Sequence, residues 1–226
     1  MDRQITLLIQ RTSRSADAES PHEYWQHFHV SIAEDAYVLD ALEAAWMQDS
    51  SLMFRHSCHH ASCGSCGMRI QGRERLACIT PVMEVARKGT VRLEPLRNFP
   101  ILADLVVDIS SLAHRLEGVG AHILTERDSG WQKFENCIEC GLCISACPIA
   151  ATSASYLGPA VLAAARNIND PNVRAQVAGD DGVWRCHTAF ECTEVCPADV
   201  QPASAIMNLR KTLLLSMFEK KGQRNE

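Results

Sequence analysis

Eleven cysteines fall in two blocks of this 226-residue chain, and their spacing carries most of its chemistry. The first block has the spacing C-x4-C-x2-C-x11-C and contains Cys58, Cys63, Cys66 and Cys78. The second block contains Cys137, Cys140, Cys143 and Cys147, followed by Cys186, Cys192 and Cys196. Cysteine thiolates at such spacings hold iron–sulfur clusters. The cysteines therefore predict a protein that carries electrons.

Two other uses of cysteine fit the sequence less well. The number of cysteines is odd, and the chain is longer than the small secreted domains that disulfides staple. Paired C-x2-C motifs also form structural zinc sites, but two such sites would use eight cysteines and leave three over. Iron–sulfur ligation accounts for all eleven.

The first block predicts a [2Fe-2S] cluster of the plant ferredoxin type. Short spacings on one loop, together with one remote cysteine, let four thiolates converge on a small cluster. Gly64 and Gly67 allow that loop to curl tightly, so that amide N–H groups can point at sulfur. The nearby histidines could suggest a Rieske centre, but four cysteines already supply every ligand. We therefore expect His59 and His60 to lie on the exposed surface of the loop.

The second block predicts two clusters with crossed ligation. In a C-x2-C-x2-C-x3-C-P run the fourth cysteine ligates the other cluster. This rule assigns a [4Fe-4S] cluster to Cys137, Cys140, Cys143 and Cys196. A [3Fe-4S] cluster is assigned to Cys147, Cys186 and Cys192.

Ala189 is the reason for expecting three irons in that last cluster. It occupies the position where a repeat of the first run would have its second cysteine, and alanine cannot bind iron. The alternative is a four-iron cluster with water or a non-cysteine ligand at the open corner.

The overall composition limits the kinds of partner and location. A net charge of −5 without a long basic run argues against binding to nucleic acid. No apolar stretch approaches the roughly 20 residues of a membrane helix. The apolar part of the N-terminal segment is too short for an export signal. We expect a soluble chain in a reducing compartment, attached to a membrane only through a partner.

The expected fold class is α+β, with two domains. Residues 1–100 should form a plant-type, β-grasp-like ferredoxin domain, and residues 101–226 an all-α domain like a bacterial ferredoxin. Periodicity predicts strands at 3–10, 27–32, 67–71, 75–79 and 90–94. It predicts helices at 37–47, 102–116, 161–168 and 202–217. Trp46 and Met47 are interpreted as core residues of the first helix.

With these residues assembled, the chain resembles the iron–sulfur subunits of succinate dehydrogenases and fumarate reductases. The matching segments are FRHSCHHASCGSCGMRIQG, LACITP, PLRNFPILADLVVD, CIECGLCISACP, LGPAVLAAAR and CHTAFECTEVCP. All eleven cysteines correspond to cluster ligands of that family, in the three sets given above.

The resemblance implies an electron relay within a larger enzyme. A flavoprotein subunit with FAD would interconvert succinate and fumarate. This chain would pass single electrons between that flavin and a quinone bound against a membrane anchor subunit. It would be a peripheral membrane protein on the cytoplasmic face, held by the anchor, and it would contribute no catalytic residue to the dicarboxylate site.

One stretch departs from the family pattern. Succinate-oxidising members often have a serine and a tryptophan after the Cys-Pro that corresponds to Cys147-Pro148. This chain has residues 149–153, IAATS, without tryptophan. His187, next to Cys186, matches a family position near the quinone and is a candidate quinone contact.

Two alternative functions remain open. The chain could serve a related flavoprotein that uses a thiol–disulfide or soluble electron acceptor, since the stretch after Pro148 is unusual. It could also be a redox-sensing or structural metal-binding module. That module would hold one labile cluster or zinc and would lack a flavoprotein partner.

Overall fold

The computed structural model describes residues 2–13, 22–122, 132–133, 136–166, 168 and 170–222. Backbone contacts divide the chain into two units. Unit 1 comprises Met1–Ile109 together with Cys140–Leu142, and unit 2 comprises Ser110–Glu139 and Cys143–Glu226. The predicted domain bounds, 1–100 and 101–226, remain a proposal.

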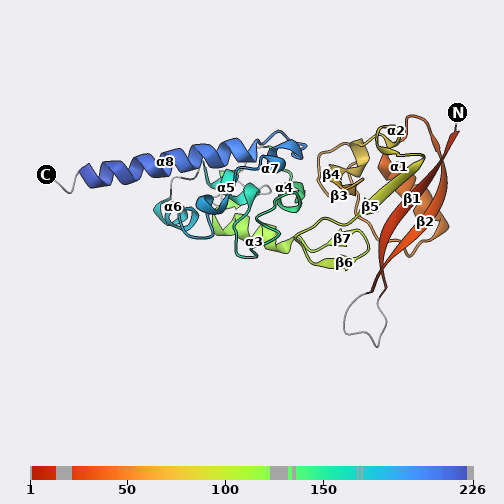
Figure 1. Cartoon of the computed structure of the whole chain (residues 1–226), viewed down its shortest axis with the longest axis horizontal. Helices are drawn as coiled ribbons and strands as arrows, with labels where there is room; N and C mark the ends of the chain where they lie inside the picture. The colour runs from red at the N-terminus through yellow and green to blue at the C-terminus, as the bar shows by residue number, and fades with distance from the viewer. Residues whose placement is uncertain are drawn as a thin grey trace. The chain divides into compact units, whose positions relative to one another are not determined.

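Unit 1 is built on a five-stranded sheet with the order β2-β1-β5-β3-β4 (Figure 1). The strands are β1 (Asp2–Ser13), β2 (His22–Ala33), β3 (Gly67–Ile70), β4 (Arg73–Leu76) and β5 (Thr90–Glu94). β1 pairs antiparallel with β2 and parallel with β5, and β3 pairs antiparallel with both β5 and β4. Its helical elements are α1 (Val38–Gln48), the short 3-10 helix η1 (Ala77–Ile79) and α2 (Val82–Val85).

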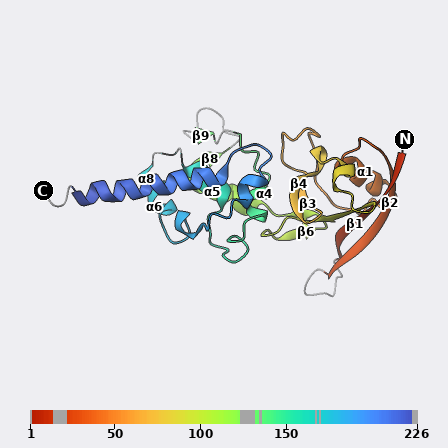
Figure 2. The ribbon, with the colours of Figure 1, turned by 45° about the horizontal axis from the view of Figure 1, so that its top comes forward.

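Alternating burial along β1 explains how the sheet holds its core. Ile5, Leu7 and Ile9 are buried on one face, and Leu7 lies opposite the buried Phe28 of β2. Side chains two residues apart share a face of a strand, so one face can be apolar throughout. α1 packs over the sheet with Val38, Leu39, Ala41, Leu42 and Ala45 buried (Figure 2).

The interpretation of Trp46 and Met47 as core residues is wrong. Trp46 is 44% exposed and Met47 78% exposed. Successive residues of an α-helix are separated by about 100°, so the buried stripe that ends at Ala45 leaves the next two residues turned towards solvent.

The helix predicted at 102–116 is also partly wrong. A hairpin of β6 (Ile101–Ala103) and β7 (Val106–Val107) precedes α3, which begins only at Ser110 and ends at Gly118. Asp104 turns the chain with a positive φ of 48°, and its buried carboxylate accepts hydrogen bonds from the amides of Thr12 and Met53. These contacts from distant residues override the local apolar spacing.

Unit 2 is mainly helical. Its further elements include α5 (Pro159–Ala165), α6 (Pro171–Val177), the 3-10 helix η2 (Val183–Arg185), α7 (Glu191–Glu194) and α8 (Pro202–Gly222). β8 (Ala121–His122) pairs parallel with β9 (Gln132–Lys133), and α4 spans Leu142–Ser145. α8 packs along the fully buried α5. The α+β fold class is confirmed.

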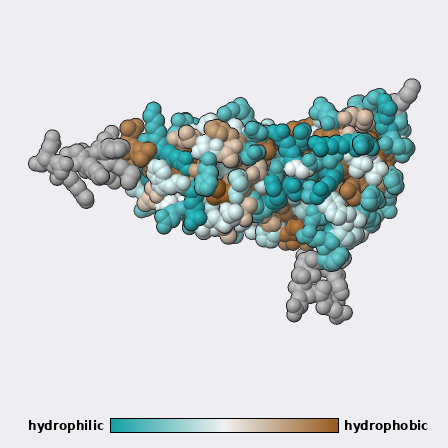
Figure 3. All heavy atoms as spheres, in the orientation of Figure 1, coloured by the Kyte–Doolittle hydropathy of each residue, from teal (hydrophilic) through white to brown (hydrophobic). Residues whose placement is uncertain are grey.

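The surface of the described residues is mixed in character. On the face drawn in Figure 3, hydrophilic residues are interspersed with smaller hydrophobic areas. Among the described residues, no helix is both long enough and apolar enough to cross a membrane.

Candidate functional site

All eleven cysteines lie among the described residues, and none of them forms a disulfide. They are divided between the two units. The four cysteines of the first block lie in unit 1, on the loop that follows α1 and in the 3-10 helix η1. Of the second block, Cys140 lies in unit 1 and the other six cysteines lie in unit 2.

The first four cysteines come from one loop and from η1. Cys58, Cys63 and Cys66 lie on the loop before β3, and Cys78 lies in η1 directly after β4. The strand predicted at 75–79 therefore ends at Leu76, and a single helical turn carries Cys78. The β3–β4 hairpin, closed by Gly72 with a φ of 79°, returns the chain so that the amide of Ala77 donates to the Cys66 carbonyl at 3.1 Å.

Backbone amides of this loop point at sulfur. The N–H groups of Ser62 and Cys63 each lie 3.3 Å from the Cys58 Sγ. The His60 amide, followed by hydrogen bonds from Cys63 and Ser62, lowers the pKa of the Cys58 thiol to about 7. Amide donors stabilise a negatively charged sulfur, which is the form that binds iron.

The other half of the same set is shielded from water. Cys66 and Cys78 are buried, whereas Cys63 is exposed. Burial raises the pKa of the Cys66 thiol to about 12, and the adjacent Cys78 side chain contributes to that rise. A group bound by these four thiols would have a protected inner edge and an outer edge at Cys63, where a redox partner could approach.

Cys147, Cys186 and Cys192 line one cavity of unit 2. Ala189 and His187 also line it, and both are exposed. The amide of Thr188 lies 3.4 Å from the Cys186 Sγ. Burial raises the pKa of the Cys147 thiol, and it raises the pKa of the Cys192 thiol to about 11.

One further residue at this cavity was not predicted from the sequence. Tyr156 is 1% exposed, and its hydroxyl has no hydrogen-bond partner among the nitrogens and oxygens of the described residues. Its pKa is raised, first by burial and then by the charges of Cys186, Cys147 and Cys192. The hydroxyl therefore faces the thiols. An aromatic residue between two cysteine runs has no spacing signal that would reveal this.

The remaining four cysteines are divided between the units. Cys140 is in unit 1, whereas Cys137, Cys143 and Cys196 are in unit 2. Burial raises the pKa of the Cys137 thiol to about 11, with added effects from the charges of Glu139 and Cys196. The Cys196 Sγ accepts a hydrogen bond from the Val200 amide at 3.4 Å. This thiol thus has the same kind of backbone donor as Cys58 and Cys186.

The cysteines of both units have surroundings that suit iron–sulfur ligation. Backbone N–H groups point at the sulfurs of Cys58, Cys186 and Cys196, other thiols are buried, and no thiol is used in a disulfide. His59 and His60, expected on the surface, are both exposed.

Two families of known proteins match parts of the chain. Residues 6–114 match a family described as a 2Fe-2S iron-sulfur cluster binding domain, and residues 133–200 match a 4Fe-4S dicluster domain.

Relatives that match most of the chain are named as iron-sulfur subunits. A fumarate reductase iron-sulfur subunit of Mycobacterium tuberculosis is 34% identical, over 87% of this chain and 88% of its own length. A succinate dehydrogenase iron-sulfur subunit of Paracoccus denitrificans is 35% identical, over 78% of this chain and 76% of its own. A chain of the Mycobacterium smegmatis Sdh1 complex has the same fold, with a TM-score of 0.78 and 21% identity over 96% of this chain and 98% of its own.

Proposed function

Because the chain belongs to the iron–sulfur subunits of succinate dehydrogenases and fumarate reductases, we propose that its eleven cysteines hold three clusters. Cys58, Cys63, Cys66 and Cys78 would hold a [2Fe-2S] cluster. Cys137, Cys140, Cys143 and Cys196 would hold a [4Fe-4S] cluster, and Cys147, Cys186 and Cys192 a [3Fe-4S] cluster. The chain is an electron-transfer subunit, and the oxidoreductase is the complex that contains it.

One observation carries the assignment of the last set. Ala189 lines the same cavity as Cys147, Cys186 and Cys192, and in the sequence it stands where a repeat of the first run would have its second cysteine. A methyl group offers no donor atom to iron. Three thiolates therefore suit a cluster that lacks the fourth iron.

When bound, such clusters accept and release one electron at a time. What this chain contributes is the control of their surroundings. Amides near Cys58, Cys186 and Cys196 stabilise charge on sulfur, and burial of Cys66, Cys147 and Cys192 keeps water from the inner sides. No acid–base residue of this chain is needed for the chemistry of the dicarboxylate.

The partners are a flavoprotein subunit with FAD and a membrane anchor subunit with its quinone. We place the quinone end near His187, because this exposed side chain lines the cavity of Cys147, Cys186 and Cys192. An imidazole N–H there could donate a hydrogen bond to a quinone oxygen. We also propose that the anchor holds this chain at the cytoplasmic face of the membrane. A thiol–disulfide or soluble acceptor is not favoured by the comparisons.

Low-temperature EPR of the anaerobically purified complex tests the cluster assignment. The oxidised sample should give a three-iron signal, and stepwise reduction should add separate [2Fe-2S] and [4Fe-4S] signals. Iron and sulfide counted on the same sample should agree with the three signals. Two four-iron signals without a three-iron signal would overturn the assignment based on Ala189.

Kinetics of His187→Ala test the quinone end separately. The variant should reduce quinone more slowly, while reduction of an artificial dye at the flavin end stays at the wild-type rate. His27→Ala, in an exposed histidine of β2, is the matched control and should leave both rates unchanged. Unchanged quinone kinetics in the His187 variant would refute its role.

A further inference from the structure

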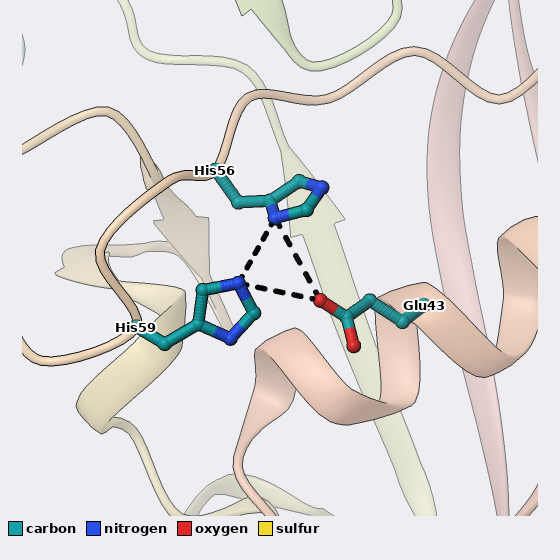
Figure 4. Close-up of side chains that lie close together, drawn as sticks. All are labelled: Glu43, His56 and His59. Atoms are coloured by element: carbon teal, nitrogen blue, oxygen red, sulfur yellow. Dashed lines mark hydrogen bonds and ion pairs between the residues drawn. The ribbon is translucent and has the colours of Figure 1, made fainter.

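Three ligand-type side chains converge beside the first group of cysteines (Figure 4). Glu43 projects from α1, and His56 and His59 come from the loop that carries Cys58. The His56 Nδ1 and the His59 Nε2 lie 3.1 Å apart. The Glu43 Oε1 lies 3.7 Å from the first of these nitrogens and 3.6 Å from the second.

The local backbone and one aromatic ring bring the two imidazoles together. His59 has a φ of 60°, in the left-handed region, and this conformation turns its side chain back towards His56. The ring of Phe54 stacks on the His56 ring, with centroids 5.3 Å apart and an interplanar angle of 23°. His56 is thus held in place by a contact outside the triad.

Hydrogen bonding alone does not explain the place of Glu43. The two imidazoles can share one N–H at 3.1 Å, provided that one ring is the donor and the other the acceptor. Both distances from the carboxylate oxygen exceed 3.5 Å, which is too long for a hydrogen bond. The oxygen is instead nearly equidistant from the two nitrogens, so the three atoms form a triangle with an open centre.

The dimensions of this triangle suit a metal ion. Zinc binds imidazole nitrogen and carboxylate oxygen at about 2.0–2.2 Å, and a tetrahedron with such bonds has edges of roughly 3.3–3.6 Å. The three edges here, 3.1, 3.6 and 3.7 Å, lie close to that range. Two histidines and one glutamate with an open fourth position form a known zinc ligand set. The side chains are 40–46% exposed, so an ion can enter from water.

We propose that Glu43, His56 and His59 bind a divalent transition-metal ion of the zinc class, with water in the fourth position. The ion links α1 to the loop on either side of Cys58, because His56 and His59 flank that cysteine. This site uses nitrogen and oxygen ligands only, so it does not compete for the thiols. It does not depend on the proposed cluster assignment.

Zinc binding to the cluster-loaded full-length chain tests the site. After anaerobic equilibrium dialysis against Zn²⁺, elemental analysis should find one zinc per chain in the wild type, at unchanged iron content. His59→Gln and Glu43→Gln each remove one proposed ligand and should lose this zinc. Their zinc affinity should fall by more than roughly 10–100-fold, which is the loss expected when a residue that only hydrogen-bonds to a ligand is removed. His27→Gln, which alters an exposed histidine outside the triad, should retain it.

X-ray absorption at the zinc edge identifies the ligands. The expected spectrum has a nitrogen and oxygen shell at about 2.0–2.1 Å with imidazole scattering, and no sulfur shell near 2.3 Å. A sulfur shell, or equal zinc content in wild type and both triad variants, would overturn the proposal. Iron and sulfide counts on the same samples report on the clusters separately, so the two proposals can fail independently.

Discussion

The Arg11 Nε lies 3.0 Å from the Asp104 Oδ2, and both side chains are almost fully buried, at 4% and 3% exposure. This ion pair joins β1 to the turn between β6 and β7. Asp104 also accepts hydrogen bonds from the amides of Thr12 and Met53, and Arg11 also contacts Asp49 at 3.2 Å. The pair therefore holds the turn between β6 and β7 against β1, in a stretch where the sequence alone indicated a helix.

Asp104→Asn should destabilise unit 1 by about 3 kcal/mol. Removing one partner of a buried ion pair costs roughly 3–5 kcal/mol of stability. The lower end of this range applies because Arg11 keeps its ion pair with Asp49. Urea unfolding of the cluster-loaded chain, followed by circular dichroism, measures the change. The control is Glu34→Gln, which breaks the exposed pair with Arg3 and should cost at most about 1 kcal/mol. Equal losses in the two variants would contradict a structural role for the buried pair.

The sequence predicted the parts of the fold that local patterns encode. The strand at Thr90–Glu94 has the predicted bounds, and the apolar stripe of α1 identified that helix. The crossed ligation of the C-x2-C-x2-C-x3-C-P run predicted that Cys147 would join Cys186 and Cys192, and these three line one cavity.

What the sequence missed depends on contacts between distant residues. The apolar spacing of 102–116 fits a helix, and only the burial of Asp104 against Arg11 explains the hairpin. Tyr156 comes close to Cys147, Cys186 and Cys192 only in the folded chain, and no local sequence pattern predicts this contact. The triad of Glu43, His56 and His59 likewise needs a helix and a loop to meet.

Retention of iron should increase with pH. Burial raises the pKa of the Cys66 thiol to about 12, and that of the Cys137 and Cys192 thiols to about 11, so all three are protonated at neutral pH in the metal-free chain. Each must lose a proton when it binds iron, so the apparent binding constant should rise about tenfold per pH unit for each of these thiols.

Competition with an iron chelator between pH 6 and pH 8 checks this dependence under anaerobic conditions. The fraction of iron that resists chelation should fall as the pH falls. Cys58 should contribute little above pH 7, since amide hydrogen bonds lower the pKa of its thiol to about 7. Iron retention that is independent of pH would show that these thiols are not protonated in the metal-free chain.

Ala189→Cys should convert the three-thiol site into a four-thiol site. Ala189 lines the cavity with Cys147, Cys186 and Cys192, and a thiolate there would supply the missing ligand. The oxidised three-iron EPR signal should disappear, and the iron content should rise by one atom per chain. Ala189→Ser has a similar size without a thiol and should keep the signal. A wild-type signal in the cysteine variant would mean that position 189 is not at the open corner.

Tyr156→Phe should lower the reduction potential at the cavity of Cys147, Cys186 and Cys192. The hydroxyl faces these thiols and has no nitrogen or oxygen partner among the described residues, so its proton is available to sulfur. A donor stabilises the reduced state more than the oxidised one, because the reduced state carries one more negative charge.

Such a hydrogen bond contributes about 0.5–1.5 kcal/mol net. Its loss corresponds to a fall in the reduction potential of roughly 20–60 mV for a one-electron couple. Redox titration of the three-iron EPR signal measures the potential, and the amplitude of the signal reports whether the cluster is intact. Tyr37→Phe, which removes an exposed hydroxyl of unit 1, should leave the potential unchanged. An unchanged potential in Tyr156→Phe at full signal amplitude would show that this hydroxyl does not act on the cluster, and its burial would then serve packing against the thiols alone.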